Sequence, residues 1–187
     1  MNQTRFLANQ FMVAMPQLAD PNFFHTVSLI CEHNETGAMG IVINRPLEIS
    51  LADVLDHMEI ELIDSNVSRL MVYAGGPVET ERGFVIHDAS DSWNSSLHIS
   101  ETLAVTTSRD ILEAIARGEG PKRSLVALGY AGWAAGQLEE EIVQNAWLST
   151  PVEDTILFDT DFEKRWEAAA ALVGVNVHLL SNETGHA

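Results

Sequence analysis

The sequence predicts a protein of the α+β class. Strand patterns come largely in succession, rather than in the strict alternation of strand and helix that builds a doubly wound sheet. The chain has 187 residues, of which 46% are hydrophobic and 20% are charged, as is typical of a globular protein. Because a domain has roughly 150 residues, we expect a single domain over residues 1–187, with its core at residues 8–180.

A β-hairpin is the clearest of the expected strand pairs. In residues 26–33, Val27, Leu29 and Cys31 alternate with more polar neighbours, and the return strand at residues 37–44 is rich in Ile and Val. The connection between them holds turn-forming residues and ends in Gly37, which predicts a hairpin. Further strands are expected at residues 70–74, 83–87, 97–99, 103–106, 124–129 and 155–158.

The first two of four expected helices have clear end signals. Ser50 precedes an apolar stripe with i, i+3, i+4, i+7 spacing, and Asp53 stands at the third helical position, which predicts a capping box. The second helix begins after Thr107 or Ser108 and ends at Gly118, because Ser and Thr are favoured N-caps and Gly commonly follows a helix.

Two more helices are expected in the last third of the chain. One begins near Ala135, with residues 139–141 (three glutamates) in its first turns, where the helix dipole favours acids. The other begins with the capping-box spacing of Thr160 and Glu163 and ends at Gly174. Its buried stripe is expected to consist of Phe162, Trp166, Ala169, Ala170 and Val173.

The charge of the chain argues against a phosphate-rich partner. Ten Lys and Arg against 27 Asp and Glu give a net charge of −17. Specific DNA-binding proteins neutralise about 6–10 phosphates, so most of the basic residues, which are scattered from Arg5 to Arg165, would have to share one face. We therefore expect no direct contact with nucleic acid.

Export and membrane signals are not expected either. The apolar run Phe11–Met15 is stopped by Pro16 and is shorter than the apolar region of about 7–15 residues in a signal peptide. The apolar stretch at residues 168–175 is under half of the roughly 18 residues that a membrane-spanning helix needs. A single cysteine excludes an intramolecular disulfide. The sequence therefore predicts a cytoplasmic protein with no membrane partner.

Glycine, proline, polar and aromatic residues concentrate in a few segments, namely Asn44–Pro46, Gly75–Val78 and Gly129–Glu139. Together with residues 14–21 and 31–40, these segments resemble, in order and spacing, the motifs of the AlgH/YqgE family of bacterial proteins. The resemblance extends from Phe11 to about Val175, and it includes Gly83–Phe84 and Trp147.

The resemblance implies a fold more than a function. Family members have no assigned molecular function and are at most labelled transcriptional regulators, through a link to alginate control. Their fold is one α+β domain, in which a split, bent β-sheet wraps into a pseudo-barrel with flanking helices, about four in this chain. On this view any effect on transcription is indirect.

The glycines of the third segment have two interpretations. Gly129, Gly132 and Gly136 follow a strand and lead into a helix, where backbone N–H groups can face an anion. The spacing is not that of a phosphate-binding loop, no Lys lies between residues 130 and 145, and three glutamates would repel phosphate. The alternative is that glycine permits tight turns and close packing beneath Trp133. Gly76 and Gly132 are expected at such turns.

The leading functional hypothesis is a non-enzymatic binding or regulatory protein, a monomer or weak homo-oligomer without a cofactor. A groove between the glycine-rich segments would recognise a protein or a small ligand, because polar and aromatic side chains concentrate there. The candidate ligand-binding residues are Asn44, Arg45, Gly75, Gly76, Tyr130, Gly132, Trp133 and Gln137.

A thiol-dependent enzyme or redox sensor is the alternative. Cys31 and His33 lie two residues apart in a strand, so their side chains are expected on one face, where the imidazole could lower the pKa of the thiol. Unpaired cysteine is, however, among the most buried residue types. A purely structural cysteine therefore remains open.

Metal sites have weaker support, and none is predicted. Cys31 and His33 would need further ligands, such as His87 or His98. Asp53, Asp56 and His57 have helical spacing and could hold Mg²⁺ or Ca²⁺, but a solvated helix face explains them equally. No G-x-S-x-G, H-E-x-x-H, C-x-x-C or EF-hand pattern occurs.

Overall fold

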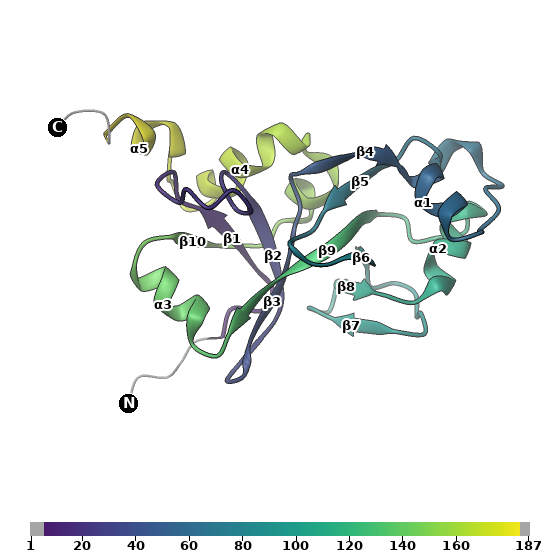
Figure 1. The fold of residues 1–187 in the computed structure, drawn as a ribbon, viewed down its shortest axis with the longest axis horizontal. Helices are drawn as coiled ribbons and strands as arrows, with labels where there is room; N and C mark the ends of the chain where they lie inside the picture. The colour runs from purple at the N-terminus through teal and green to yellow at the C-terminus, as the bar shows by residue number, and fades with distance from the viewer. Residues whose placement is uncertain (1–5, 184–187) are drawn as a thin grey trace.

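One long strand, β9 (Ser124–Ala134), joins two halves of a ten-stranded sheet (Figure 1). The computed structural model describes residues 6–183, so Arg5 lies outside the described residues. The first part of β9, up to Tyr130, pairs with one set of strands, and its last part pairs with another set from Ala131 onwards. The expected strand at 124–129 is therefore longer than the sequence pattern indicated.

The first half of the sheet has the strand order β10-β1-β2-β3 and is antiparallel throughout. The predicted hairpin is confirmed, with only Glu35 and Thr36 between its strands. The apolar run that ends at Pro16 forms an unpredicted strand, and so do the residues after Ala146. The four strands are β1 (Gln10–Ala14), β2 (Val27–Asn34), β3 (Gly37–Val42) and β10 (Trp147–Pro151).

The second half continues from β9 in the order β6-β8-β7, and β5 lies along the other edge of β9. The β5–β9 pair is parallel, and β4 extends the sheet by pairing with β5. These strands are β4 (Pro46–Ser50), β5 (Met71–Ala74), β6 (Val78–Asp88), β7 (Ser96–His98) and β8 (Leu103–Thr106).

Helices lie around both halves, with α1 and α2 beside the second half and the later helices beside the first (Figure 1). The four predicted helices are present, and a fifth follows them. They are α1 (Leu51–His57), α2 (Arg109–Ala116), α3 (Gln137–Val143), α4 (Phe162–Ala171) and α5 (Val177–Glu183). A 3₁₀ turn, η1 (Ser65–Val67), and a π-helical turn, η2 (Thr155–Asp159), complete the set.

Several helix ends follow the predicted signals. The capping box at Ser50 is confirmed, since Asp53 N–H donates to the Ser50 hydroxyl and the Asp53 carboxylate accepts from Ser50 N–H. Gly118 and Gly174, with φ of 76° each, lie in the left-handed region just beyond α2 and α4. Ser108 is the N-cap residue of α2, although its side chain accepts no hydrogen bond from the helix.

The predictions for residues 155–163 are wrong. The expected strand is the π-helical turn η2, because a short apolar run fits either structure and here buries the adjacent Ile156 and Leu157. Thr160 does not form a capping box with Glu163. Its hydroxyl instead donates to the carbonyl of Thr155, and Asp161 is the N-cap of α4.

The buried apolar side chains form three cores, which hold the helices against the sheet. The largest lies inside the curl of the sheet, is shared by both halves, and is closed by α4 and η2. The second lies between the second half and helices α1 and α2, and the third lies between the first half, α3 and the segment around Phe23. This curled sheet with helices around it confirms the α+β class and the wrapped sheet that the resemblance implied.

Helix α4 anchors the inner core. Trp166 is buried, and its indole N–H donates to the carbonyl of Ala14 at 2.8 Å. Val173 does not belong to the buried stripe, as it is 45% exposed beyond the end of the helix. Arg165 is buried instead, where it donates to the carbonyl of Ile43 and lies 5.0 Å from the Tyr73 ring.

Candidate functional site

Two glycine-rich segments cross where β9 bends. A Cβ atom on Gly76, whose φ is 154°, would lie 2.1 Å from the carbonyl carbon of Tyr130. One on Gly75 would lie 2.2 Å from the carbonyl oxygen of Gly129, and Gly129 itself has φ of 80°. Real Cβ atoms do not approach backbone this closely, so these three glycines allow two chain segments to touch. Their role here is close packing of backbone.

Gly132 differs from its neighbours. It lies within β9 and not at a turn, and a Cβ there would meet one atom only, a ring carbon of Tyr130 at 3.7 Å. The prediction that Gly132 lies at a turn is therefore wrong. Gly136 has φ of 77° and open space around it, and it is the N-cap of α3.

Asn44 and Arg45 stabilise the loop before β2. The Asn44 side chain accepts from Val27 N–H and donates to the carbonyl of His25, both at 2.9 Å. The guanidinium of Arg45 donates to three carbonyls of this loop, at 2.7–2.8 Å. Both side chains thus have intramolecular partners, and neither lines the groove described below.

Two buried tryptophans share one carboxylate of α3. The indole N–H groups of Trp133 and Trp147 donate to Glu141 Oε2 at 3.0 and 2.8 Å, and Gln137 donates to its other oxygen at 2.9 Å. The Gln137 carbonyl also accepts from Ala134 N–H, so this side chain has partners on both sides. Gln137 therefore holds the start of α3 and is not a lining residue of the groove.

An open groove of about 840 Å³ lies between the tip of the β2–β3 hairpin and strands β6, β7 and β8. Of the eight predicted ligand-binding residues, it brings together Tyr130, Gly132 and Trp133. Tyr130 is half-buried and meets Phe84 edge to face, with ring centroids 5.7 Å apart. Phe84 itself is only 3% exposed, so Tyr130 supplies the part of this aromatic floor that solvent reaches.

Most residues that line the groove were not predicted from the sequence, Arg82, Phe84 and Leu97 among them. Arg82 places its guanidinium 5.4 Å from the Phe84 ring while also pairing with Glu79 at 3.1 Å. Leu97 in β7 lies on the wall and is 39% exposed. Gly83–Phe84 belongs to the segments that carry the family resemblance, so that motif was the available signal for this side of the groove.

The pair of Cys31 and His33 does not form, because β2 has a β-bulge. The register with β3 shifts between Ile30 and Glu32, which reverses the alternation of side chains after Cys31. Cys31 faces the inner core, whereas His33 faces α3, where its Nε2 lies 2.6 Å from Glu139 Oε1. The two side chains lie on opposite faces of the strand, contrary to expectation.

The thiol itself is buried and only 3% exposed. Burial, with a smaller contribution from the carboxylate of Glu32, raises the pKa of Cys31 to about 12. A thiolate nucleophile is therefore strongly disfavoured at neutral pH. The imidazole of His33 accepts from Leu7 N–H at Nδ1, so its proton lies on Nε2 and is donated to Glu139.

The histidines considered as metal ligands are not brought together. His87 is buried and binds the Thr106 hydroxyl and the carbonyl of Asp88, each at 2.7 Å. The carboxylate of Asp53 is used by the capping box. Within residues 6–183, no group of three or more His, Cys, Asp or Glu side chains is arranged to hold a metal ion.

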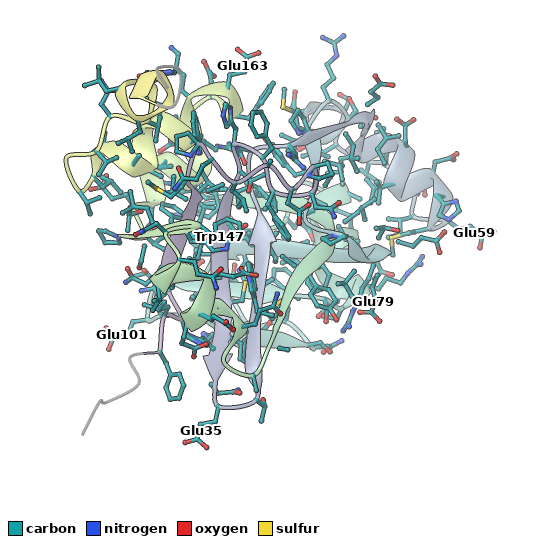
Figure 2. All side chains as sticks on the ribbon, turned by 60° about the vertical axis from the view of Figure 1, so that its left-hand side comes forward. Glu35, Glu59, Glu79, Glu101, Trp147 and Glu163 are labelled. Carbon is teal, nitrogen blue, oxygen red and sulfur yellow. The ribbon has the colours of Figure 1, made fainter. Side chains whose placement is uncertain are left out.

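Acidic side chains are spread over the whole surface. Figure 2 shows Glu35, Glu59 and Glu163 pointing outward on different sides of the molecule, while Trp147 lies in its interior. Four of the basic residues form ion pairs with acidic neighbours, namely Arg82, Arg109, Arg117 and Arg123. Arg45 and Arg165 bind backbone carbonyls, so six of the nine Lys and Arg side chains within residues 6–183 have partners in the protein.

Comparison with known proteins gives a consistent result. A family model described as AlgH-like matches residues 11–178. A UPF0301 protein of Thioalkalivibrio sulfidiphilus is 60% identical over 96% of both chains, and one of Methylococcus capsulatus is 53% identical over 99% of this chain and 98% of its own.

Solved structures show the same similarity. The solution structure of AlgH from Pseudomonas aeruginosa matches with a TM-score of 0.81 at 50% identity, covering 100% of this chain and 99% of that one. A crystal structure of a Corynebacterium diphtheriae protein matches with a TM-score of 0.75 over 97% of this chain and 94% of that one. At 17% identity, it shares the fold. No helix within residues 6–183 is long and apolar enough to cross a membrane.

Proposed function

The chain belongs to the AlgH-like family, and from that premise we propose that it is a binding protein whose open groove receives an extended segment of a partner protein. The family itself is uncharacterised, so the proposal rests on the groove. The observation that carries it is the aromatic floor beside β7, an edge strand of the sheet within the part of the chain that the structure describes. We propose that this binding takes place in the cytoplasm and that any effect on transcription passes through the partner.

The sheet edge supports an extended partner. Strand β7 is the last strand in its half of the sheet, and residues 95–97 line the groove. An edge strand offers unpaired backbone groups, to which a peptide can add as a further strand. Alternate side chains of that peptide would then face Phe84 and Tyr130 on the floor.

The chemistry of the groove favours a peptide with aromatic or apolar side chains and a positive charge. Aromatic side chains bury a large area and stack on one another, which supports binding to Phe84 and Tyr130. The net charge of −17 attracts a basic partner, and the groove contributes the carboxylate of Glu32, while its cation, Arg82, is paired with Glu79. A nucleic acid is negatively charged, so the net charge of the protein would repel it.

A photo-cross-linking experiment tests this proposal. Benzoylphenylalanine is placed at Leu97, inside the groove, or at Val143, which is 81% exposed on α3, in cells whose own copy of the gene is deleted. We expect a discrete cross-linked protein at position 97 and not at position 143. Identical products at both positions, or no product at position 97, would overturn the proposal.

Tyr130→Phe provides the matched variant. The Tyr130 hydroxyl forms no hydrogen bond within residues 6–183, so its removal should change the free energy of unfolding by less than about 0.5 kcal/mol. If a partner binds this hydroxyl, the cross-link at position 97 should decrease. Tyr130→Ala removes the aromatic floor as well and should abolish the cross-link. An unchanged yield with a folded Tyr130→Ala protein would contradict the assignment of the groove.

A further inference from the structure

A second cavity, next to the groove, lies between α1, the start of α2 and strands β6 and β9. Its volume is about 430 Å³, which is within the range of small-molecule sites. Its floor is apolar and consists of Val54, Met58, Val85, Leu112, Val126 and Leu128. This cavity is the more enclosed of the two.

The cavity exists because one strand position has no side chain. Gly83 lines it, and a Cβ atom at this position would have no heavy atom within 4 Å. The next residue on the same face of β6, Val85, is 2% exposed and packs in the second core. A residue such as valine at position 83 would therefore fill space that is now open.

A break in strand pairing shapes the entrance. Val78 pairs with Tyr130 and Gly83 pairs with Leu128, so residues 79–82 loop out opposite Gly129 alone. Thr80 and Glu81 of this loop line the cavity, whereas Arg82 lines the groove. Thr107 lines both sites, so the groove and the cavity are neighbours that share this residue.

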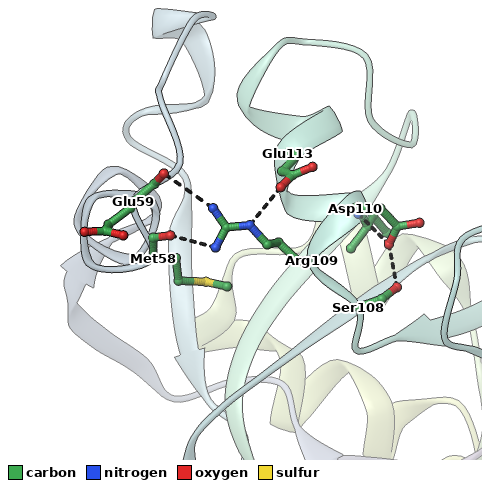
Figure 3. A network of polar contacts seen from close by, with 7 residues as sticks. Met58, Glu59, Ser108, Arg109, Asp110 and Glu113 are labelled. Atoms are coloured by element: carbon green, nitrogen blue, oxygen red, sulfur yellow. Dashed lines mark hydrogen bonds and ion pairs between the residues drawn. The ribbon is translucent and has the colours of Figure 1, made fainter.

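The opposite side of the entrance is held by Arg109 (Figure 3). Its guanidinium donates to Glu113 at 2.8 Å, to the carbonyl of Met58 at 2.7 Å and to the carbonyl of Glu59 at 3.4 Å. The beginning of α2 is thereby tied to the end of α1. These contacts fix the two helices that form the cavity walls.

The charged side chains around the cavity determine whether its ligand can be an ion. The positive charge of Arg109 is compensated by Glu113, and the carboxylates of Asp53 and Glu81 lie at the rim. An anion would face these carboxylates, and a charge of either sign on the apolar floor would lose its hydration without a partner there. The hydroxyls of Thr80 and Thr107 form no hydrogen bonds within the described residues and can bind a polar atom at the entrance.

From this geometry we propose that the cavity is a binding site for a small, uncharged, mostly apolar molecule with one hydrogen-bonding end. The apolar part lies against Val85 and Leu128, in the space next to Gly83. The polar end lies at Thr80 and Thr107, near solvent. Binding of this molecule involves no chemical step and no metal ion.

Two fluorescent probes with the same ring system test the proposal. N-phenyl-1-naphthylamine is uncharged, and 8-anilinonaphthalene-1-sulfonate adds a sulfonate to it. We expect saturable 1:1 binding of the uncharged probe, with at least tenfold weaker binding of the sulfonate. Absence of saturable binding, or equal affinity for both probes, would overturn the assignment.

Variants locate the binding. Gly83→Leu fills the cavity and should weaken binding of the uncharged probe at least tenfold, whereas Tyr130→Ala, in the groove, should leave the affinity unchanged. The reverse result would place the probe in the groove and refute the proposal. If Gly83→Leu does not fold, amide chemical-shift changes in the wild-type protein decide. The chemical-shift changes caused by the uncharged probe should be largest at Val85, Leu112 and Leu128. Changes centred on Tyr130 would contradict the assignment of the cavity as the binding site.

Discussion

The two halves of the sheet are filled in different ways. In the first half, Trp133 and Trp147 pack on its outer face, and both are fixed by Glu141. In the second half, α1 and α2 cover the outer face but leave a cavity of about 430 Å³ beside Gly83. The difference is one of packing: hydrogen bonds to Glu141 fix the two buried tryptophans on the outer face of the first half, whereas the outer face of the second half retains an unfilled cavity.

The largest expected effect is in the inner core, which both halves share and α4 closes. Trp166→Ala should lower the free energy of unfolding by about 3–5 kcal/mol, because it removes a buried ring and the hydrogen bond to Ala14. Chemical denaturation measures this loss. Val173→Ala is the control, since Val173 is 45% exposed and should change stability by less than about 0.5 kcal/mol. A loss below about 1 kcal/mol for Trp166→Ala would contradict the description of the inner core.

The crossing between the halves should be nearly as sensitive. Gly76→Ala places a Cβ atom 2.1 Å from backbone and in a left-handed conformation, so we expect a loss of about 2–4 kcal/mol. Gly132→Ala, three residues beyond Gly129, should stay within about 0.5 kcal/mol of wild type. Thermal unfolding of both variants compares them directly. Equal destabilisation of the two variants would mean that the close backbone contact between Gly76 and Tyr130 does not set the cost of a side chain at Gly76.

The two glycines show what sequence reasoning can and cannot predict. The sequence predicts the hairpin at Gly37 and the capping box at Ser50, because both depend on residues close together in the chain. It treats Gly76 and Gly132 alike, since only the crossing of distant segments distinguishes them. The resemblance supplied the wrapped sheet, which local periodicity does not contain.

The candidate site shows the same division. Tyr130 and Trp133 were predicted, and Arg82 and Leu97 were missed because they reach the groove from strands distant in sequence. The bulge that separates Cys31 from His33 adds one residue to β2 relative to β3, and nothing in the local alternation indicates it. Register is a property of two strands, so one strand's pattern could not place the thiol.

A smaller effect is expected for the carboxylate that joins the two tryptophans. Glu141→Gln should destabilise by about 1–2 kcal/mol, because an amide cannot accept from both indoles and from Gln137 with the strength of a carboxylate. The neighbouring Glu140→Gln is the control, as Glu140 is exposed. Urea denaturation followed by tryptophan fluorescence measures both. A Glu141→Gln protein as stable as the control would weaken the view that polar anchors hold the first half.

The smallest expected effect concerns the reactivity of Cys31. With the pKa of the buried thiol raised to about 12, only about one molecule in a thousand carries a thiolate at pH 9, and the thiol is also inaccessible. Alkylation by iodoacetamide should therefore be negligible in the native protein between pH 7 and 9 and rapid after unfolding. A Leu97→Cys, Cys31→Ala double variant is the control, because its thiol lies in the open groove and should titrate near the ordinary value of about 8.5.

The same pKa has a consequence for stability. Because the folded-state pKa of Cys31 lies above that of the unfolded chain, the unfolded chain releases its proton first as the pH rises above about 9. The contribution of the protonated thiol is present below that pH and is lost progressively towards pH 12, so wild type should lose more stability than Cys31→Ala over this range. Denaturation at pH 7 and pH 10 measures the difference. Fast alkylation of the native protein, or the same pH dependence of stability in both proteins, would show that solvent reaches Cys31 at the β2 bulge. The first half would then not be more tightly packed than the second.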